Sequence, residues 1–135
     1  MAKKVLIVDD VPFVRKTLSE ILSAAHFEVV GEASDGMEAI MLYQKLRPDL
    51  VTMDVVMPRM SGLEATRAIL KMDNEARIVI ISAMGAESLV MEAVNVGAKD
   101  YILKPFTAAD VIKTIERALI DDTQLVGRGS ANKNA

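Results

Sequence analysis

The stretch Lys4-Val-Leu-Ile-Val-Asp-Asp10 places a short, continuous apolar run directly before two adjacent aspartates. Runs this short are typical of parallel strands that are buried on both faces of a sheet. Four similar runs follow along the chain. The five strands that the sequence predicts are Lys4–Val8, Phe27–Ala33, Leu50–Met53, Arg77–Ile81 and Tyr101–Leu103.

Stretches of helical period separate these runs and have recognisable ends. Pro12 suits the first turn of a helix, and apolar residues recur behind it at Leu18 and Leu22. Gly97 suits the end of the fourth helix. Three other starts resemble capping boxes: Asp35 to Glu38, Ser61 to Glu64, and Thr107 to Asp110. The alternation predicts one α/β domain of (βα)₅ order, a doubly wound, five-stranded parallel sheet with right-handed crossovers.

The carboxyl ends of the strands are where such folds place their active sites. The polar residues that follow the predicted strands there are Asp9, Asp10, Asp54, Ser82 and Lys104. The second strand ends near Ala33 and contributes no obvious group. Each residue alone has an ordinary explanation as a helix cap, a turn residue or a solvated charge. Their convergence on one crevice favours a functional site.

Three carboxylates in one crevice need a positive partner, because like charges at short range raise each other's pKa values. Oxygen ligands without histidine or cysteine favour Mg²⁺. Asp54 can then attack a phosphoryl group as a nucleophile, with Lys104 and Ser82 contacting the phosphoryl oxygens. The bond between Lys104 and Pro105 can be cis at modest cost, and a cis bond would turn the lysine inward.

Composition limits the classes of function. The chain has 135 residues, 51% of them apolar, a formal net charge of −3, no cysteine and one histidine, His26. One domain with a real core is expected, without disulfides, thiol chemistry or a histidine metal site. Interspersed charges argue against nucleic-acid binding, and no apolar run suits a bilayer span or a signal peptide. We therefore predict a cytoplasmic protein without membrane insertion.

The helical and strand patterns end at about residue 120. We predict that residues 1–120 form the domain, and that residues 121–135 form a disordered tail because they lack periodicity and are rich in turn-forming residues. This tail is interpreted either as the remnant of a linker or as a protease-site scar from recombinant expression.

The motifs, taken in this order, resemble those of the response-regulator receiver family. The resemblance covers about Lys3 to Leu119. The matching segments are Val5-Leu-Ile-Val-Asp-Asp10, Asp54-Val-Val-Met-Pro-Arg-Met-Ser-Gly62, Ser82-Ala83, and Gly97-Ala-Lys-Asp-Tyr-Ile-Leu-Lys-Pro-Phe106. It implies a flavodoxin/CheY-like fold with strand order 2-1-3-4-5. It also implies a receiver that is not a conventional enzyme, since it catalyses only its own phosphorylation and dephosphorylation.

The resemblance implies a role for each acidic residue. Asp54 matches the phosphoacceptor and also a Mg²⁺ ligand. Asp10 matches a direct ligand of Mg²⁺, and Asp9 a ligand that acts directly or through water. Val56 would offer its backbone carbonyl to the same ion.

Roles for the remaining site residues also follow from the resemblance. Lys104 and Ser82 match the pair that binds the phosphoryl group. Tyr101 matches an aromatic switch residue, which turns inward when Ser82 moves towards the phosphoryl group. The expected docking surface is the face built from the fourth helix, the fifth strand and the fifth helix.

Within the family the chain is most similar to the stand-alone chemotaxis branch. This implies a histidine kinase of the CheA type as phosphoryl donor, a flagellar switch protein of the FliM type as target, and a monomeric state. Val56 and Met84 depart from the polar residues of the best-known chemotaxis members. Apolar groups there would hinder hydrolysis or a dedicated phosphatase.

Other functions remain as alternatives. The nearest alternative keeps the chemistry and changes the partner: the chain would be the receiver half of a transcription factor or a phosphorelay shuttle. An aspartyl-nucleophile phosphatase would want its nucleophile after the first strand and a second aspartate two positions later, but Val11 follows the adjacent Asp9 and Asp10. A flavin carrier would need a phosphate-binding loop where these two aspartates would repel phosphate.

Overall fold

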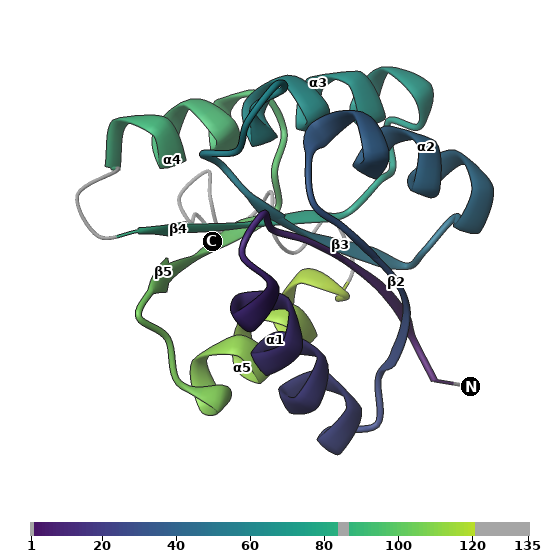
Figure 1. Ribbon diagram of the computed structural model, residues 1–135, viewed down its shortest axis with the longest axis vertical. Helices are drawn as coiled ribbons and strands as arrows, with labels where there is room; N and C mark the ends of the chain where they lie inside the picture. Colours follow the sequence, from purple (N-terminus) through teal and green to yellow (C-terminus); the bar gives the residue numbers. More distant parts are fainter. Residues whose placement is uncertain (1, 84–86, 121–135) are drawn as a thin grey trace, which may run out of the picture.

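Strands and helices alternate through the whole described part of the chain, residues 2–83 and 87–120 of a computed structural model (Figure 1). The strands are β1 Lys4–Val8, β2 Glu28–Ala33, β3 Leu50–Asp54, β4 Ile78–Ala83 and β5 Asp100–Lys104. The helices are α1 Pro12–Ala24, α2 Gly36–Leu46, α3 Gly62–Met72, α4 Glu87–Asn95 and α5 Ala108–Ala118. The predicted (βα)₅ order is confirmed.

The sheet is parallel throughout and has the strand order β2-β1-β3-β4-β5. Helices α2, α3 and α4 cover one face, and α1 and α5 cover the other (Figure 1). Strand β1 therefore lies between β2 and β3, which is where the order reverses along the chain. Folds of this kind bind ligands beside that reversal, at the carboxyl ends of the strands.

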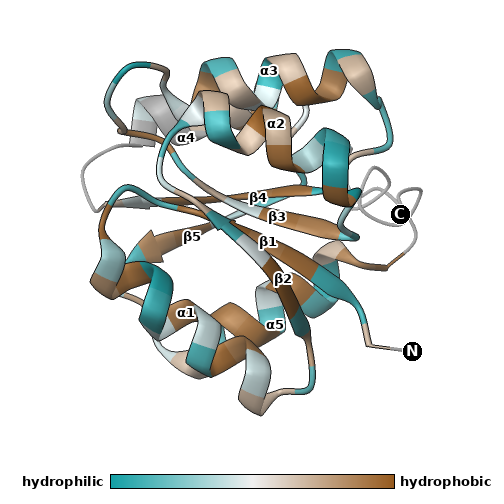
Figure 2. Ribbon diagram, turned by 45° about the vertical axis from the view of Figure 1, so that its right-hand side comes forward, coloured by the Kyte–Doolittle hydropathy of each residue, from teal (hydrophilic) through white to brown (hydrophobic). Residues whose placement is uncertain are grey.

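Burial explains why such short apolar runs become strands. β3 is buried along its whole length, and β1 is buried after its first residue. Because helices cover both faces, successive side chains enter two separate cores, and Figure 2 shows hydrophobic residues along the central strands. Leu6, Val51 and Ile80 belong to the core beneath α2 and α3, whereas Ile7 and Val79 belong to the core beneath α1 and α5.

Three strands extend further than the apolar runs predicted. The pairing continues through Asp54, which lies opposite Ile81, and through Ser82 and Ala83, which lie opposite Leu103 and Lys104. Backbone hydrogen bonds do not require apolar side chains, so the polar site residues are part of the sheet. This places them on rigid elements rather than on loops.

Two of the three predicted capping boxes are present. Ser61 with Glu64 and Thr107 with Asp110 exchange the reciprocal bonds, so aspartate replaces the usual glutamate at α5. The box predicted at Asp35 is only half formed. Asp35 accepts from the Glu38 amide, but the Glu38 carboxylate accepts from the Ser34 amide at 2.8 Å.

Two expectations fall outside the described residues. These are the tail 121–135 and Met84. Within the ranges that are described, each helix is too short or too polar to cross a bilayer.

Gly62 sits where the β3–α3 loop returns to the end of β3. Its amide donates to the Val55 carbonyl at 2.8 Å, and a Cβ at this position would overlap the Asp54 carbonyl oxygen. At Gly31, by contrast, a Cβ would meet only the ends of leucine side chains, the nearest being Leu46 Cδ1 at 2.9 Å and Leu6 Cδ1 at 3.4 Å. The close approach at Gly62 therefore holds the backbone of a site residue.

We expect Gly62→Ala to lower the free energy of unfolding by about 2–3 kcal/mol, because backbone would have to move to admit the methyl group. Gly31→Ala is the matched control and should change it by less than about 1 kcal/mol. Urea denaturation of both variants measures this. Equal losses in the two variants would contradict the importance of the contact at Gly62.

Candidate functional site

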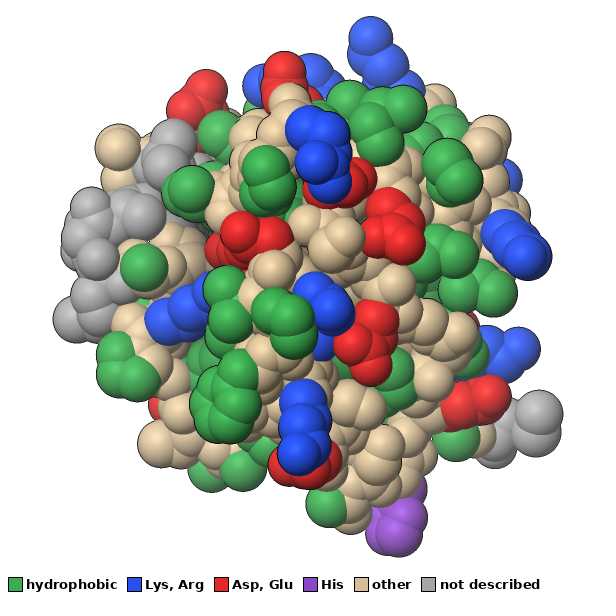
Figure 3. Space-filling view, in the orientation of Figure 1, with side chains coloured by type: hydrophobic (Ala, Val, Ile, Leu, Met, Phe, Trp, Pro, Cys, Tyr) green, Lys and Arg blue, Asp and Glu red, His purple; other side chains and the backbone are tan. Residues whose placement is uncertain are grey.

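Three carboxylates meet at the carboxyl ends of β1 and β3. Asp9 and Asp10 directly follow β1, and Asp54 ends β3, the strand that pairs with β1 up to the Val8–Met53 position. One oxygen from each carboxylate lies within 4.8 Å of the others. The three aspartates expected to converge are therefore together. The face of the molecule drawn in Figure 3 otherwise shows acidic and basic side chains interspersed.

Asp9 is almost fully buried, at 1% exposure, and each of its polar atoms has a partner. Oδ1 accepts from the Val11 amide at 2.9 Å, and Oδ2 accepts from Lys104 Nζ at 3.0 Å. Its amide donates to the Ala33 carbonyl at 3.0 Å, and its carbonyl accepts from Arg15 Nη1 at 2.7 Å. The carboxylate is thus fixed in one orientation.

Lys104, at the end of β5, brings a positively charged ammonium group to the carboxylates. Its Nζ lies 3.0 Å from Asp9 Oδ2 and 3.7 Å from Asp54 Oδ1. The peptide bond between Lys104 and Pro105 is cis. These two distances show that one ammonium group faces two of the three carboxylates. The three carboxylates and Lys104 together therefore keep an excess of negative charge.

The surroundings of Asp54 disfavour the ionised form of its carboxyl group. The pKa of its carboxyl is raised from 3.8 to about 7, first by burial and then by the negative charges of Asp9 and Asp10, while the positive charge of Lys104 opposes the rise. A nucleophile must be ionised. A divalent cation among the carboxylates would favour the ionised form, and a donor set of oxygens alone suits a hard cation such as Mg²⁺.

The remaining predicted residues lie beside the cluster. Ser82 is buried one position beyond Ile81, the β4 partner of Asp54, and its Oγ donates to the Ala83 carbonyl at 3.2 Å. Tyr101, on β5, is 44% exposed, so its ring faces solvent in this structure. The side chain of Val56 is 68% exposed directly after the strand that carries Asp54.

Two charged residues of the site were not anticipated from sequence. Arg15 binds the Asp9 carbonyl and Glu32, and Glu32 comes from β2, the strand whose end offered no obvious site residue in the sequence. A signal was present in the helical pattern. Arg15 lies three and seven residues before Leu18 and Leu22, so it occupies the inward-facing stripe of α1. A charge on that stripe indicates a buried partner.

A further ion pair anchors the loop that follows Asp54. Arg59, in the left-handed backbone region with φ 69°, donates through Nη2 to Asp35 Oδ2 at 2.6 Å. Arg59 therefore lowers the pKa of the Asp35 carboxyl. This pair joins the β3–α3 loop to the start of α2.

Comparison with known proteins agrees with this geometry. The family model of the response regulator receiver domain matches residues 5–116. The chain belongs to the response-regulator receiver family. The assignment makes it a receiver rather than a conventional enzyme.

Among relatives of this receiver, the chemotaxis protein CheY of Thermotoga maritima is 47% identical over 87% of this chain and 98% of that protein. CheY of Bacillus subtilis is 47% identical over 88% of this chain and 99% of that protein. Among solved structures, the CheX–CheY–BeF₃–Mg²⁺ complex from Borrelia burgdorferi has a chain with a TM-score of 0.84 and 36% identity, covering 88% of this chain and 90% of that one. The sheet order of this receiver is that of the CheY-like flavodoxin fold.

The raised pKa of Asp54 predicts an unusual dependence of stability on pH. The folded state binds the Asp54 proton more tightly than the unfolded state does. The contribution of this proton to the free energy of unfolding is therefore fully present below about pH 4 and is lost as the pH rises through about 7. Asp54→Asn removes the titration. Without divalent cations, this variant should be more stable than the wild type at pH 8 by roughly 1–3 kcal/mol.

The difference should shrink steadily as the pH is lowered to 5. Urea denaturation in chelator-treated buffer at several pH values measures it. A difference that stays constant over this range would show that Asp54 does not titrate as the structure indicates.

Proposed function

We propose that this receiver accepts a phosphoryl group on Asp54 from a histidine kinase and signals through the modified state. The observation that carries this is the convergence of three carboxylates and Lys104 at the reversal of strand order, in a chain of the receiver family. We place this activity in the receiver domain, residues 1–120, and in the cytoplasm.

Mg²⁺ fits the oxygen donors of this site. Asp9, Asp10 and Asp54 would hold it with their carboxylates, and Val56 with its backbone carbonyl. When bound, Mg²⁺ would neutralise charge on the phosphoryl oxygens. Asp9 Oδ1 and Oδ2 already accept protein hydrogen bonds, which favours a contact through water for this residue.

The transfer itself needs one nucleophile and suitable alignment. An Asp54 oxygen attacks the phosphorus, the bond from phosphorus to the donor's histidine nitrogen breaks, and that nitrogen keeps the electron pair. The product is an acyl phosphate on Asp54. Lys104 Nζ, 3.7 Å from Asp54 Oδ1, would pair with a phosphoryl oxygen, and Ser82 would donate a hydrogen bond to another.

A test of acceptance uses a small acyl phosphate with Mg²⁺ and intact mass measurement. The wild type should gain one phosphoryl group, and Asp54→Asn should gain none. Asp49→Asn is the matched control, since Asp49 is an exposed aspartate that precedes the amino end of the same strand. Uptake that persists in Asp54→Asn, or is absent from the wild type, would reject the assignment.

We further propose chemotaxis as the pathway, with a CheA-type kinase and a FliM-type flagellar switch protein as partners. The support is the name of the relatives, chemotaxis protein CheY, at 47% identity. A CheX-type phosphatase is a further candidate partner, because the relative from Borrelia burgdorferi was solved in a complex with CheX. Tyr101, 44% exposed on β5, would lie on the docking face as a switch residue together with Ser82.

If the receiver signals by binding a flagellar switch protein, phosphorylation should strengthen its binding of a FliM-type switch peptide by roughly tenfold, as is typical of coupled sites. Tyr101→Ala should remove most of this gain. Met37→Ala, an exposed apolar residue on α2, is the control and should keep it. Fluorescence titration of a labelled peptide measures both. Equal binding by the two phosphorylation states would favour the transcription-factor or phosphorelay alternative.

A further inference from the structure

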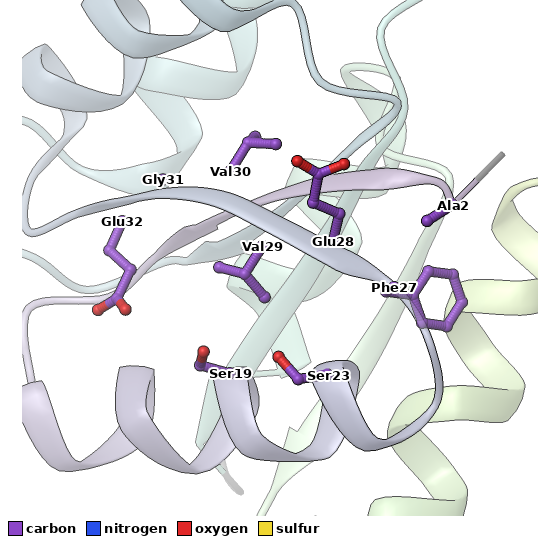
Figure 4. A pocket seen from close by; sticks show the side chains of 9 residues that line it. All are labelled: Ala2, Ser19, Ser23, Phe27, Glu28, Val29, Val30, Gly31 and Glu32. Carbon is purple, nitrogen blue, oxygen red and sulfur yellow. The ribbon is translucent and has the colours of Figure 1, made fainter.

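Arg15 joins three elements around the backbone of the acidic cluster. From α1, its Nη1 donates to the Asp9 carbonyl at 2.7 Å, and its Nε donates to Glu32 Oε1 at 3.0 Å. Glu32 lies at the carboxyl-terminal part of β2. Figure 4 shows its carboxylate directed away from the strand towards the start of α1, at one end of an open hollow along this edge of the sheet.

The Arg15 guanidinium is largely removed from water, which costs free energy unless hydrogen bonds within the protein replace those to water. The Arg15 side chain is only 19% exposed, whereas that of Glu32 is 43% exposed. A guanidinium taken out of water requires hydrogen-bond partners. Its planar fork can serve two acceptors at once, which a lysine ammonium on a flexible chain does less well.

For the geometry of the acidic cluster, the hydrogen bond from Arg15 to the Asp9 carbonyl matters more than the ion pair between Arg15 and Glu32. The Asp9 carbonyl belongs to the peptide unit that joins Asp9 to Asp10. A peptide unit is planar, so fixing its oxygen relative to the Asp9 Cα–C bond fixes the plane that also contains the Asp10 nitrogen and Cα. The side chain of Asp9 is already held by Val11 and Lys104. The carbonyl contact adds control over the direction in which Asp10 leaves the backbone.

We propose that Arg15, held in place by Glu32, is a positioning residue that orients the Asp9–Asp10 peptide for cation binding. The inference rests on the proposed function of the acidic cluster. Strand β2, which carries no ligand, thereby supports the site through a charged side chain.

If Arg15 acted only through its charge, it would weaken cation binding at the acidic cluster. Its positive charge repels a cation, and Glu32 offsets that charge. Removing the charge should therefore strengthen cation binding, whereas losing the orientation of Asp10 should weaken it. The sign of the change separates the two roles.

The experiment is calorimetric titration of the unphosphorylated, full-length protein with Mg²⁺. Arg15→Gln should bind Mg²⁺ about tenfold more weakly, as is usual when a supporting partner of a ligand is lost. Arg15→Lys keeps the charge but not the fork, and should also bind more weakly. Lys16→Gln, the exposed neighbour on α1, is the matched control and should bind at least as tightly as wild type. Unchanged or tighter binding by Arg15→Gln overturns the proposal.

The link to Glu32 is tested with a double-mutant cycle. Glu32→Gln should weaken Mg²⁺ binding in the wild-type background, and most of this effect should vanish in the Arg15→Gln background. An equal effect in both backgrounds would show that Glu32 acts by its own charge, and would overturn its assigned role.

A readout without metal separates this proposal from the proposed function. Amide hydrogen exchange of Asp9 and Val11, followed by NMR in chelator-treated buffer, should be faster in Arg15→Gln than in Lys16→Gln. Unchanged exchange overturns the positioning role. If the wild type binds no Mg²⁺, the proposed cation site fails, and the exchange result still decides whether Arg15 orders this backbone.

Discussion

Repulsion among three carboxylates is the constraint on which the rest of this structure depends. Two of them, Asp9 and Asp54, are at most 7% exposed, where water screens their charges poorly. The parallel sheet makes their proximity unavoidable, because β1 and β3 are neighbours and end at the same edge. Lys104 relieves part of the repulsion, and burial together with the repulsion that remains raises the pKa of Asp54.

The supporting structure around this cluster is rigid where it needs to be. Asp54 is part of β3, and its carbonyl is packed so closely against Gly62 that a side chain there would not fit. Asp9 has a partner for every polar atom. These contacts hold Asp9 and the backbone of Asp54 near each other despite the repulsion between their carboxylates, which favours a positive charge between them.

Much of this arrangement follows from local sequence patterns. Short apolar runs predict the strands, and the general rule for doubly wound sheets predicts that Asp9, Asp10, Asp54 and Lys104 meet. Strand ends were predicted too short at β3, β4 and β5, since backbone pairing continues past the last apolar residue. The capping prediction at Asp35 was half right because Glu38 bonds to Ser34.

Arg15 and Glu32 show where reading along the chain stops being informative. They are 17 positions apart, and their contact depends on how α1 crosses the edge strand β2. No short motif specifies that crossing. Lys104 is 95 positions from Asp9, yet it was predicted, because it follows a strand and the sheet order alone brings strand ends together. A partner that lies partway along a helix is specified only by packing.

The two cations act on different parts of the same aspartate, and this difference bears on how the site works. Lys104 contacts the carboxylate, and under the proposed phosphorylation of Asp54 it would exchange that contact for one with a phosphoryl oxygen. Arg15 contacts the backbone carbonyl, whose charge would not change in the proposed phosphorylation. One contact is therefore suited to respond to the modification, and the other to remain constant through it. If the receiver is phosphorylated and restored repeatedly, as proposed, both contacts would serve it, because a backbone that moved with each change of charge would lose its alignment for the next transfer.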